Sequence, residues 1–452
     1  MFEKISQFMD EKLSTPMAKI AEQRHLRAIR DGIIATLPLI IVSSMFMVIA
    51  FLPNQMPADW GLTQFIKTNQ FKILLPYRMT MYIMTLYAVF GIGYSLARSY
   101  KLDGLSGGVM AEMAFLLTII PKVGPTASDA VKALAATNPD LQAYVKSVPG
   151  GLLIAPGNLG SAGMFVGIIA AIFAVEVYRF TETKNFKISM PPQVPASVAR
   201  SFEALVPTAI ILVVVSAITM WIGVDVHSLM AKVVAPLVSA SDTLPSVLVI
   251  IFLGMFFWTF GIHGWSIVGT LARPLWLTLL DSNTAAYATN SAIPHIAAEP
   301  FYQWFIMIGG AGTTIGLAIL FLVKSKSAYG KALGKTAIIP SIFNINEPMI
   351  FGAPIVLNPI LMIPFIFTPM ICAVIAWIAT NLGLVNRVVA IAPWTLPGPI
   401  GAYLATGGDW RGAVLSIILI ILSVFIYLPF FTLYDNKLLK EENGEVPAEK
   451  LA

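Results

Sequence analysis

Two ionisable side chains lie inside long apolar stretches of this sequence. His263 lies in WTFGIHGWS, and Glu347 lies in SIFNINEPMI beside two asparagines and a proline. An ionisable group at the centre of a bilayer costs about 2.5–3.5 kcal/mol even on lenient insertion scales, and it normally faces a cavity or a partner. His263 and Glu347 are therefore candidates for proton transfer or for binding a polar ligand. The alternative is a structural pair in which the two side chains bond each other.

Further hydrogen-bonding groups follow in the same half of the chain. Glu299 lies in AAEPF, where the alternatives are an interfacial position or a helix cap, and GGAGTT allows close approach of the backbone and offers two hydroxyls. Amides, hydroxyls and a carboxylate beside aromatic faces suit a sugar, which has apolar C–H faces and a hydroxyl rim. The aromatic candidates are Trp258 and Trp394, although an isolated tryptophan is more often an interfacial anchor. The other candidate binding residues are Glu299, Gly309, Gly310, Gly312, Thr313 and Asn346.

The composition excludes an ordinary soluble protein. The chain has 452 residues, of which 57% are hydrophobic and 12% charged, with a mean hydropathy of +0.78. Soluble domains carry about 25% charged residues, so these values predict an all-α polytopic membrane protein in the lipid bilayer. The net charge of +5 comes from basic residues at the ends of apolar runs, which indicates topology and no nucleic-acid surface. The sequence has no GxxxxGK[ST] motif and no Cys/His cluster at metal spacing, so we expect no cofactor and no metal.

Nine apolar runs approach the roughly 20 residues that a membrane-spanning helix needs. They are Gly32–Leu52, Thr80–Ala97, Leu105–Ile120, Leu152–Val177, Ala204–Val224, Ser246–Gly269, Phe301–Val323, Ile355–Thr380 and Ala413–Leu433. A tenth, Leu384–Leu404, is broken by PWTLPGP. Helices broken by Pro and Gly within a membrane usually line a cavity or lie buried in protein.

Basic residues predict the orientation of these runs. Lys and Arg cluster in residues 4–30, 179–200 and 324–335, which read as cytoplasmic. The first five runs alternate consistently with this, but the second half does not unless some segments are re-entrant. We expect re-entrant hairpins at NSAIPHIAAEP and AIIPSIFNINEPMIFGAP, which are too short and interrupted to span. Both termini are expected in the cytoplasm.

One segment divides the chain. Residues 225–243, DVHSLMAKVVAPLVSASDT, carry apolar residues at helical spacing. The segment is too short and polar to span, so we expect an amphipathic helix that lies flat at the interface. It separates a first half with few polar groups from a second half rich in Pro, Gly, Asn and His.

Five ordered motifs resemble those of a known family. They are RAIRDGIIATLPLIIVSSMF, GNLGSAGMF, FWTFGIHG, AAEPFYQWFIMIGGAGTT and NINEPMIFGAPIVLNP. They are similar to enzyme IIC, the membrane component of the bacterial phosphotransferase system, in its lactose, cellobiose and diacetylchitobiose branch. The resemblance implies about ten transmembrane helices with two re-entrant hairpins, and a homodimer. It also implies a sugar-carrying half that moves across the membrane as a rigid body. The expected domains are 1–224 for dimerisation, 225–243 as connector, 244–434 for transport and 435–452 as a cytoplasmic tail.

The resemblance also assigns roles to residues. The cavity histidine and the hairpin glutamate of the family correspond to His263 and Glu347. Asn158 in GNLG, the backbone around Gly309–Thr313, Trp258 and Trp394 match sugar-lining segments, and Arg30 matches a basic position near the cytoplasmic mouth.

The reaction that the resemblance implies is phosphorylation of a disaccharide on its 6-hydroxyl during inward release. This oxygen attacks a phosphocysteine in line while Glu347 accepts its proton and His263 hydrogen-bonds a neighbouring oxygen. The single cysteine, Cys372, lies in an apolar run. We therefore expect the phosphoryl donor on a separate IIB protein, with IIA, HPr and enzyme I upstream.

Two other functions remain open from the residues. A proton-coupled sugar symporter would use Glu347 and His263 to carry the proton, and a membrane-embedded hydrolase or isomerase would use them without net transport. Cellobiose, diacetylchitobiose and lactose differ at a few substituents, and the sequence does not choose among them.

Overall fold

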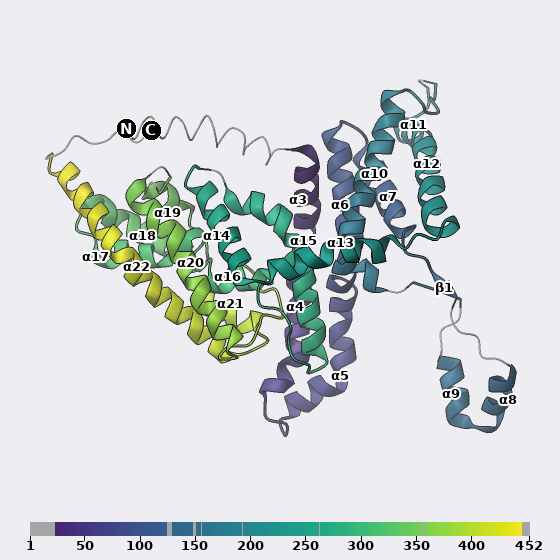
Figure 1. Cartoon of the computed structure of the whole chain (residues 1–452), viewed down its shortest axis with the longest axis horizontal. Helices are drawn as coiled ribbons and strands as arrows, with labels where there is room; N and C mark the ends of the chain where they lie inside the picture. Colours follow the sequence, from purple (N-terminus) through teal and green to yellow (C-terminus); the bar gives the residue numbers. More distant parts are fainter. Residues whose placement is uncertain are drawn as a thin grey trace. The chain divides into compact units, whose positions relative to one another are not determined.

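The computed structural model is helical almost throughout (Figure 1). It describes residues 23–123, 129–147, 151–154, 156–191, 193–261, 263–353, 355–356 and 358–444. Lys4, Lys12 and Lys19 and residues 445–452 of the predicted tail lie outside this part. Two short strands, β1 (Lys122–Val123) and β2 (Leu152–Leu153), pair antiparallel. The predicted all-α class is confirmed for the described chain.

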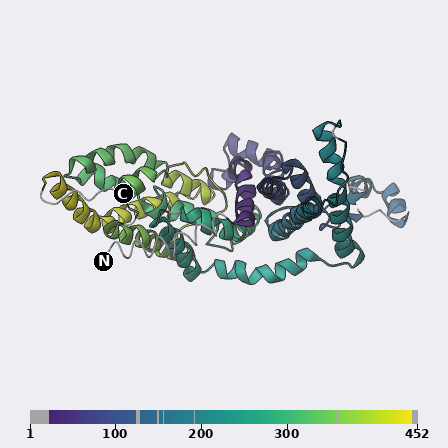
Figure 2. The ribbon, with the colours of Figure 1, turned by 90° about the horizontal axis from the view of Figure 1, so that it is seen from above.

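The chain forms two compact units. Unit 1 holds Met1–Arg30, Leu37–Met81 and Val233–Ala452, and unit 2 holds Asp31–Thr36 and Tyr82–Lys232. The amphipathic segment forms helix α13 (Val226–Ser241), which begins in unit 2 and ends in unit 1. Figure 2 shows α13 as one unbroken helix. The predicted domain limits at 224 and 243 stay a prediction.

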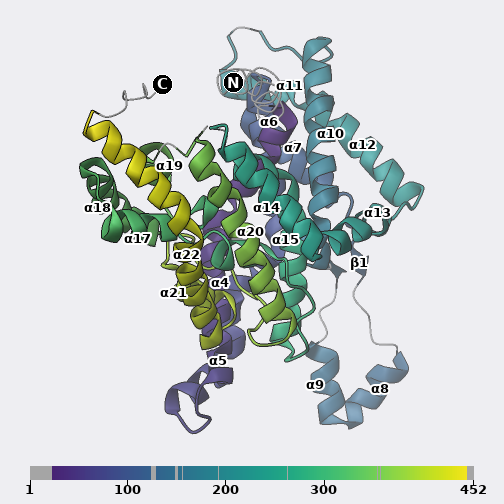
Figure 3. The same cartoon turned by 60° about the vertical axis from the view of Figure 1, so that its left-hand side comes forward.

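Unit 2 is a bundle in which α6, α7 and α10 lie side by side (Figures 1 and 3). Glycine lets α6 and α7 approach closely, because a Cβ atom on Gly93 would lie 2.4 Å from the Ala111 Cβ and 2.7 Å from the Gly107 carbonyl oxygen. Asp103 caps α7 by accepting the Ser106 N–H at 2.8 Å. The helices are α6 (Met84–Ser99), α7 (Gly104–Leu116), α8 (Asp129–Thr137), α9 (Pro139–Ser147), α10 (Met164–Thr183), α11 (Ala196–Glu203) and α12 (Leu205–Ser216), with 3-10 turns η4 (Pro156–Leu159) and η5 (Ser161–Gly163). α12 continues into a π-helical turn, η6 (Ala217–Trp221).

Unit 1 packs around large side chains that are fully buried, including Trp304, Tyr302 and Tyr427. Its helices are α4 (Leu37–Phe51), α5 (Gly61–Arg78), α14 (Leu244–Trp258), α15 (Gly264–Ala288), α16 (Glu299–Phe305), α17 (Ile315–Lys324), α18 (Ala328–Ile342), α19 (Glu347–Gly352), α20 (Pro359–Asn381), α21 (Gly398–Ala405) and α22 (Trp410–Glu442), with 3-10 turns η2 (Leu52–Gln55) and η7 (Ala311–Thr313). The chain passes between the units within helix α3 (Arg24–Ala35), between Thr36 and Leu37, within turn η3 (Met81–Ile83) and within α13.

The cytoplasmic-loop candidate KSKSAYGKALGK is mostly helical. It enters α18, whose N-terminus is capped by Ser327, and α18 packs with α17 and α22 (Figure 3). Two side chains near the end of α22 bond the start of α18 and the residues just before it, which we call the α18 corner. Asp435 accepts the Ser325 hydroxyl at 2.5 Å and the Lys326 N–H at 2.7 Å, and Glu442 accepts the first two N–H groups of α18 at 2.9 Å each.

Five described helices are long and apolar enough to cross a membrane, or up to seven if each of two bent pairs counts as one span. This indicates a multi-pass membrane protein. The expected number of about ten spans and the two re-entrant hairpins stay predictions.

Three predicted runs differ from the helices. Ser246–Gly269 is divided between α14 and α15, and Phe301–Val323 is divided between α16 and α17. The chain turns there through positive φ angles, at Gly261 in the first break and at Gly309, Gly310 and Gly312 in the second. The run Leu152–Val177 begins as a strand, and its helix starts only at Met164.

Candidate functional site

The helix breaks of unit 1 are joined by asparagine side chains. Asn344, between α18 and α19, accepts the Gly309 N–H at 2.8 Å and donates to the carbonyls of Trp394 and Leu396 at 2.7 and 2.9 Å. Its φ of +62° is one that asparagine adopts more readily than most residues. One amide thus bonds backbone groups of two segments that are distant from it in the sequence and that lack helical partners there.

Asn346 makes a second joint of the same kind. Its Nδ2 donates to the Ala311 carbonyl at 2.6 Å and to the Thr314 hydroxyl at 2.9 Å, and the side chain is buried. A Cβ atom on Gly310 would lie 2.4 Å from the Asn346 Cγ, so glycine is required there. The structure therefore brings the predicted binding residues Gly310 and Asn346 together, with both amide donors of Asn346 used inside the protein.

The Gly309–Thr313 segment is also buried. Gly312 has a φ of +79°, and a Cβ atom there would lie 2.2 Å from the Phe365 ring. Its carbonyl accepts the Tyr427 hydroxyl at 2.8 Å, and the Thr313 hydroxyl donates to Ile306 O at 2.5 Å. These groups build the break; that they also contact a ligand stays a prediction.

His263, by contrast, is exposed at the start of α15. Its Nδ1 accepts the Ser266 N–H at 3.2 Å and lies 3.0 Å from the Ser266 hydroxyl, so His263 caps this helix. Since a backbone N–H can only donate, Nδ1 is the acceptor, and the neutral ring carries its proton on Nε2. The cap thus orients the ring and leaves Nε2–H as the donor that takes no part in the cap.

Trp258, at the end of α14, lies directly against this imidazole. The two ring centroids are 4.5 Å apart and the planes are inclined by 49°. Trp258 is only 5% exposed, and its indole nitrogen has no hydrogen-bond partner among the described residues. Its contact with His263 is established, whereas its use as a sugar platform stays a prediction.

Glu347 is exposed and is the first residue of α19. Among the described residues, Glu347 and Arg30 are charged groups near enough to the His263 ring to act on its charge. The structure therefore places three predicted site residues, His263, Glu347 and Arg30, within electrostatic range in unit 1. Because both are exposed, His263 and Glu347 are open to a ligand rather than sealed in a buried pair.

Glu299 is bound by a residue that the sequence did not single out. Both nitrogens of one edge of the Arg273 guanidinium, on α15, donate to its carboxylate, with Nε 3.0 Å from Oε2. A bidentate pair of this kind fixes the start of α16 against α15. The ion pair gives Glu299 a structural contact, and its predicted contact with sugar stays untested.

The remaining two predicted residues lie at breaks. Trp394 is 48% exposed just before α21, and its carbonyl is held by Asn344. Asn158 lies in turn η4 of unit 2, whereas all the other predicted residues belong to unit 1.

A second polar cluster was not predicted. Asp242, after α13, accepts the N–H groups of Ile296 and Ala297 at 2.9 and 2.8 Å and lies 2.9 Å from the His295 Nδ1. Arg387 donates to two carbonyls of the same non-helical segment, those of Ile293 and Pro294. The segment NSAIPHIAAEP could have indicated this cluster. It is not helical, so its backbone groups need hydrogen-bond partners from elsewhere in the chain.

An aromatic cluster lies beside the Arg273–Glu299 pair. The Trp276 and Tyr302 rings are 4.6 Å apart, and each lies 6.1 Å from the Trp265 ring. The indole nitrogens of Trp265 and Trp276 and the Tyr302 hydroxyl are buried. The apolar sequence around these residues did not indicate that their polar atoms would be buried together.

Comparison with known proteins gives a consistent result. The family model described as phosphotransferase system, EIIC, matches residues 30–369. The chain is 37% identical over 446 residues to the lichenan permease IIC component of Bacillus subtilis (strain 168), covering 97% of this chain and 96% of that protein. It is also 37% identical over 445 residues to the cellobiose-specific EIIC component of Geobacillus stearothermophilus, with the same coverage.

A solved structure supports the same assignment. The crystal structure of the transporter ChbC, the IIC component from the N,N'-diacetylchitobiose-specific phosphotransferase system, matches with a TM-score of 0.86 and 34% identity. The match covers 97% of this chain and 100% of that one. Since the family model, the relatives and the fold agree, this chain belongs to the EIIC family of the phosphotransferase system.

Proposed function

We propose that this protein is a sugar permease that takes up a β-linked disaccharide of the cellobiose or diacetylchitobiose type across a bacterial cell membrane. The observation that carries the proposal is the likeness over nearly the whole chain to ChbC and to a cellobiose-specific relative. The exposed His263 and Glu347 supply polar groups that a sugar requires, and the buried Trp258 packs against the imidazole.

The reaction uses the geometry of these two residues. The sugar 6-hydroxyl attacks the phosphorus of a phosphocysteine, the O–P bond forms, the S–P bond breaks, and the cysteine leaves as a thiolate. Glu347 accepts the hydroxyl proton, and Nε2–H of His263 donates to a neighbouring sugar oxygen. Positioning and general-base help are the main contributions that a protein can make to phosphoryl transfer.

The phosphoryl donor is a IIB protein. Cys372 is fully buried in α20, so this thiol is out of reach of a sugar or a soluble partner. A relative from Staphylococcus haemolyticus, 32% identical over 437 residues, is named lactose-specific EIICB component, which joins IIC and IIB in one name. This chain covers 70% of that relative.

The remaining architecture follows the family resemblance. We propose ten membrane helices with two re-entrant hairpins, cytoplasmic termini and a homodimer formed by residues 1–224. The sugar half, 244–434, moves across the membrane with 225–243 as its connector. The exposed residues Leu229, Val233 and Leu237, spaced four apart on α13, support an interfacial position for the connector.

Uptake into vesicles tests the function. The purified full-length chain is reconstituted with phosphorylated IIB inside, and a panel of β-linked disaccharides is added outside. We expect accumulation of sugar 6-phosphate that requires phosphorylated IIB. Accumulation of unmodified sugar that an uncoupler abolishes would contradict the proposal and favour proton symport.

A further inference from the structure

Helix α13 is held mainly by side-chain hydrogen bonds at its two ends, because it packs along none of the other described helices. After its C-terminus, Asp242 accepts two backbone N–H groups and bonds His295, all in unit 1. In its first turn, His227 bonds the end of α7, in unit 2. Since α13 begins in unit 2 and ends in unit 1, these two attachments determine which unit it follows when the sugar half moves.

His227 is buried against the end of α7. Its Nε2 lies 2.9 Å from the Thr118 hydroxyl oxygen, and its ring makes a T-shaped contact with the Phe115 ring, with centroids 6.1 Å apart. The Thr118 hydroxyl donates to Phe115 O at 2.6 Å, so its oxygen accepts from His227 and Nε2 carries the proton. The other ring nitrogen, Nδ1, is buried with no hydrogen-bond partner among the described residues. The ring is therefore neutral, and only one of its nitrogens is satisfied.

The attachment at His227 is the weaker of the two. Asp242 uses both carboxylate oxygens, and hydrogen bonds to an ionised group are stronger than those between neutral groups. The His227 attachment is one hydrogen bond between neutral groups, and it keeps Nδ1 away from the water that would bond it outside the protein. If α13 must leave one unit, we expect it to leave unit 2, by release of His227.

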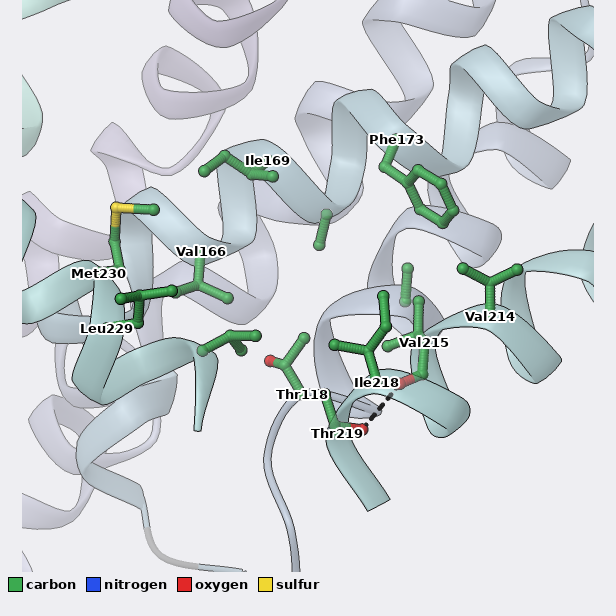
Figure 4. A pocket seen from close by; sticks show the side chains of 13 residues that line it. Thr118, Val166, Ile169, Phe173, Val214, Val215, Ile218, Thr219, Leu229 and Met230 are labelled. Atoms are coloured by element: carbon green, nitrogen blue, oxygen red, sulfur yellow. Dashed lines mark hydrogen bonds between the residues drawn. The ribbon is translucent and has the colours of Figure 1, made fainter. Parts of the chain in front are cut away.

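The surroundings of His227 leave room for this end of α13 to move. Thr118, Thr219, Leu229 and Met230 line an apolar pocket of about 310 Å³, so the first turns of α13 border a cavity and not a close-packed core (Figure 4). Gly223, between η6 and α13, has a φ of +79° and no atom within 4 Å of a Cβ position. Because Thr219 bonds η6 to a carbonyl at the end of α7, α13 would turn about Gly223 while η6 stays in place.

We propose that the hydrogen bond from His227 to Thr118 is a latch that holds the connector helix on unit 2, and that protonation of His227 opens it. A second proton would sit on Nδ1, which has no acceptor among the described residues while the latch is closed, whereas water accepts from it once the ring is released. The open form therefore binds this proton more readily than the closed form. The inference rests on the proposed movement of the sugar half.

The charges around His227 agree with this direction. Among the described residues, Asp225 is the charged group that acts on the ring, and its carboxylate is already used at the start of α13, where it accepts the Ser228 N–H at 2.9 Å. From the end of α7 the ring meets Phe115 and Thr118, which carry no charge. A histidine in water titrates at about 6.5. Because the open form binds more protons, the latch should open as the pH falls through this range.

A distance measurement on the full-length protein tests the latch without using transport. Spin labels are attached at Ser228→Cys on α13 and at Thr183→Cys on α10, both exposed, in a Cys372→Ser background. The protein is mixed with an excess of unlabelled chain in nanodiscs, so that distances between subunits do not contribute. We expect one distance near neutral pH and a second whose population, relative to the first, grows by up to about tenfold for each pH unit below about 6.5. A distribution that pH does not change overturns the proposal.

Substitutions assign the titration to His227. His227→Gln supplies an amide N–H to Thr118 and cannot titrate, so we expect the first distance at every pH. Thr118→Val removes the acceptor and should give the second distance even at neutral pH, whereas the matched control Thr289→Val, at an exposed position just after α15, should not. If Thr118→Val does not fold by thermal melting, His227→Leu replaces it by removing the donor. A pH response retained in His227→Gln, or a wild-type distribution without the donor or the acceptor, overturns the proposal.

Bending of α13 is the competing explanation. Pro236 cannot donate a hydrogen bond to the carbonyl of Lys232, the residue at which the chain leaves unit 2. A bend there would leave Ser228 on unit 2 and give one distance at every pH, which overturns the latch. The vesicle assay reports separately on function, because wild-type protein that forms no sugar 6-phosphate would contradict the permease proposal without changing the measured distances.

Discussion

The polar residues in the broken segments of unit 1 form two regions that differ in their contacts. In the joint region, Asn344 and Asn346 are buried, and their amides bond backbone groups of segments far away in the sequence. In the open region, His263 and Glu347 are exposed, and His263 bonds the neighbouring Ser266 through Nδ1. Polar residues in an apolar sequence thus have two separate explanations. One group substitutes for helical hydrogen bonds, and the other is available for chemistry.

Substitution at Glu347 should give the largest effect on activity and none on stability. Glu347→Gln keeps the shape and a hydrogen-bonding group but removes the base, so we expect sugar phosphorylation to fall about 10²–10⁴-fold while sugar binding is largely retained. Binding and sugar-phosphate formation would be measured on one preparation, with a thermal melt. Normal phosphorylation would remove Glu347 from the mechanism, and a lower melting temperature would move it to the joint region.

Asn346 should show the opposite pattern. Asn346→Leu leaves the Ala311 carbonyl and the Thr314 hydroxyl without this donor, and each buried unsatisfied group costs about 1–3 kcal/mol. We expect a lower melting temperature with binding and phosphorylation lost together. Asn381→Leu, at an exposed position at the end of α20, is the matched control and should change stability by less than about 0.5 kcal/mol. Full stability of Asn346→Leu with weaker sugar binding would place Asn346 in the open region.

Two substitutions of His263 separate its role as a helix cap from its proposed role in binding sugar. His263→Ala removes both the helix cap and Nε2, whereas His263→Asn retains a capping oxygen and removes only Nε2. We expect both variants to lose about 1–3 kcal/mol of sugar affinity, and only the alanine variant to lose about 1 kcal/mol of stability. Titration calorimetry and thermal melts would be compared. Unchanged affinity in the asparagine variant would reduce His263 to a cap.

Substitution of Glu299 should give the smallest effect, and it shows whether Glu299 belongs to the joint region or to the open region. Glu299→Gln weakens the pair with Arg273, which is partly buried, so we expect about 1 kcal/mol of lost stability. If Glu299 belongs to the joint region, sugar affinity in the folded fraction stays unchanged. Reduced affinity at normal stability would show that its predicted contact with the sugar is correct.

The sequence predicted the helical class, the amphipathic α13 and the break at PWTLPGP, since these depend on composition and local pattern. It did not predict that two apolar runs are divided at Gly261 and at Gly309–Thr314. Hydropathy averaged over a span is insensitive to a few glycines, whereas backbone direction depends on them. Helix α5 was also missed, because its Gln, Lys and Asn residues lower its hydropathy.

The candidate site was predictable only by residue type. The free-energy cost of polar groups in apolar surroundings identified the candidate residues. It could not separate Asn346 from Glu347, which are adjacent in sequence but differ in burial. The partners of such residues lie elsewhere in the chain: Arg273 is 26 positions from Glu299, and Asn344 is 50 from Trp394. These contacts depend on tertiary packing, which local pattern does not encode.

The length of α22 has a consequence for the surrounding lipid. Its 33 residues extend about 50 Å at 1.5 Å per residue, well beyond the roughly 30 Å of bilayer hydrocarbon. The last turns of α22 cannot shift independently of α18, because Asp435 and Glu442 bond them to the start of α18. A mismatch between the bilayer and the apolar part of α22, which ends before Asp435, must then be met by tilting α22 and the α18 corner together. Membrane thickness should therefore affect the orientation of α22 and the α18 corner together. We expect thinner bilayers to increase the tilt of the whole corner and not of α22 alone.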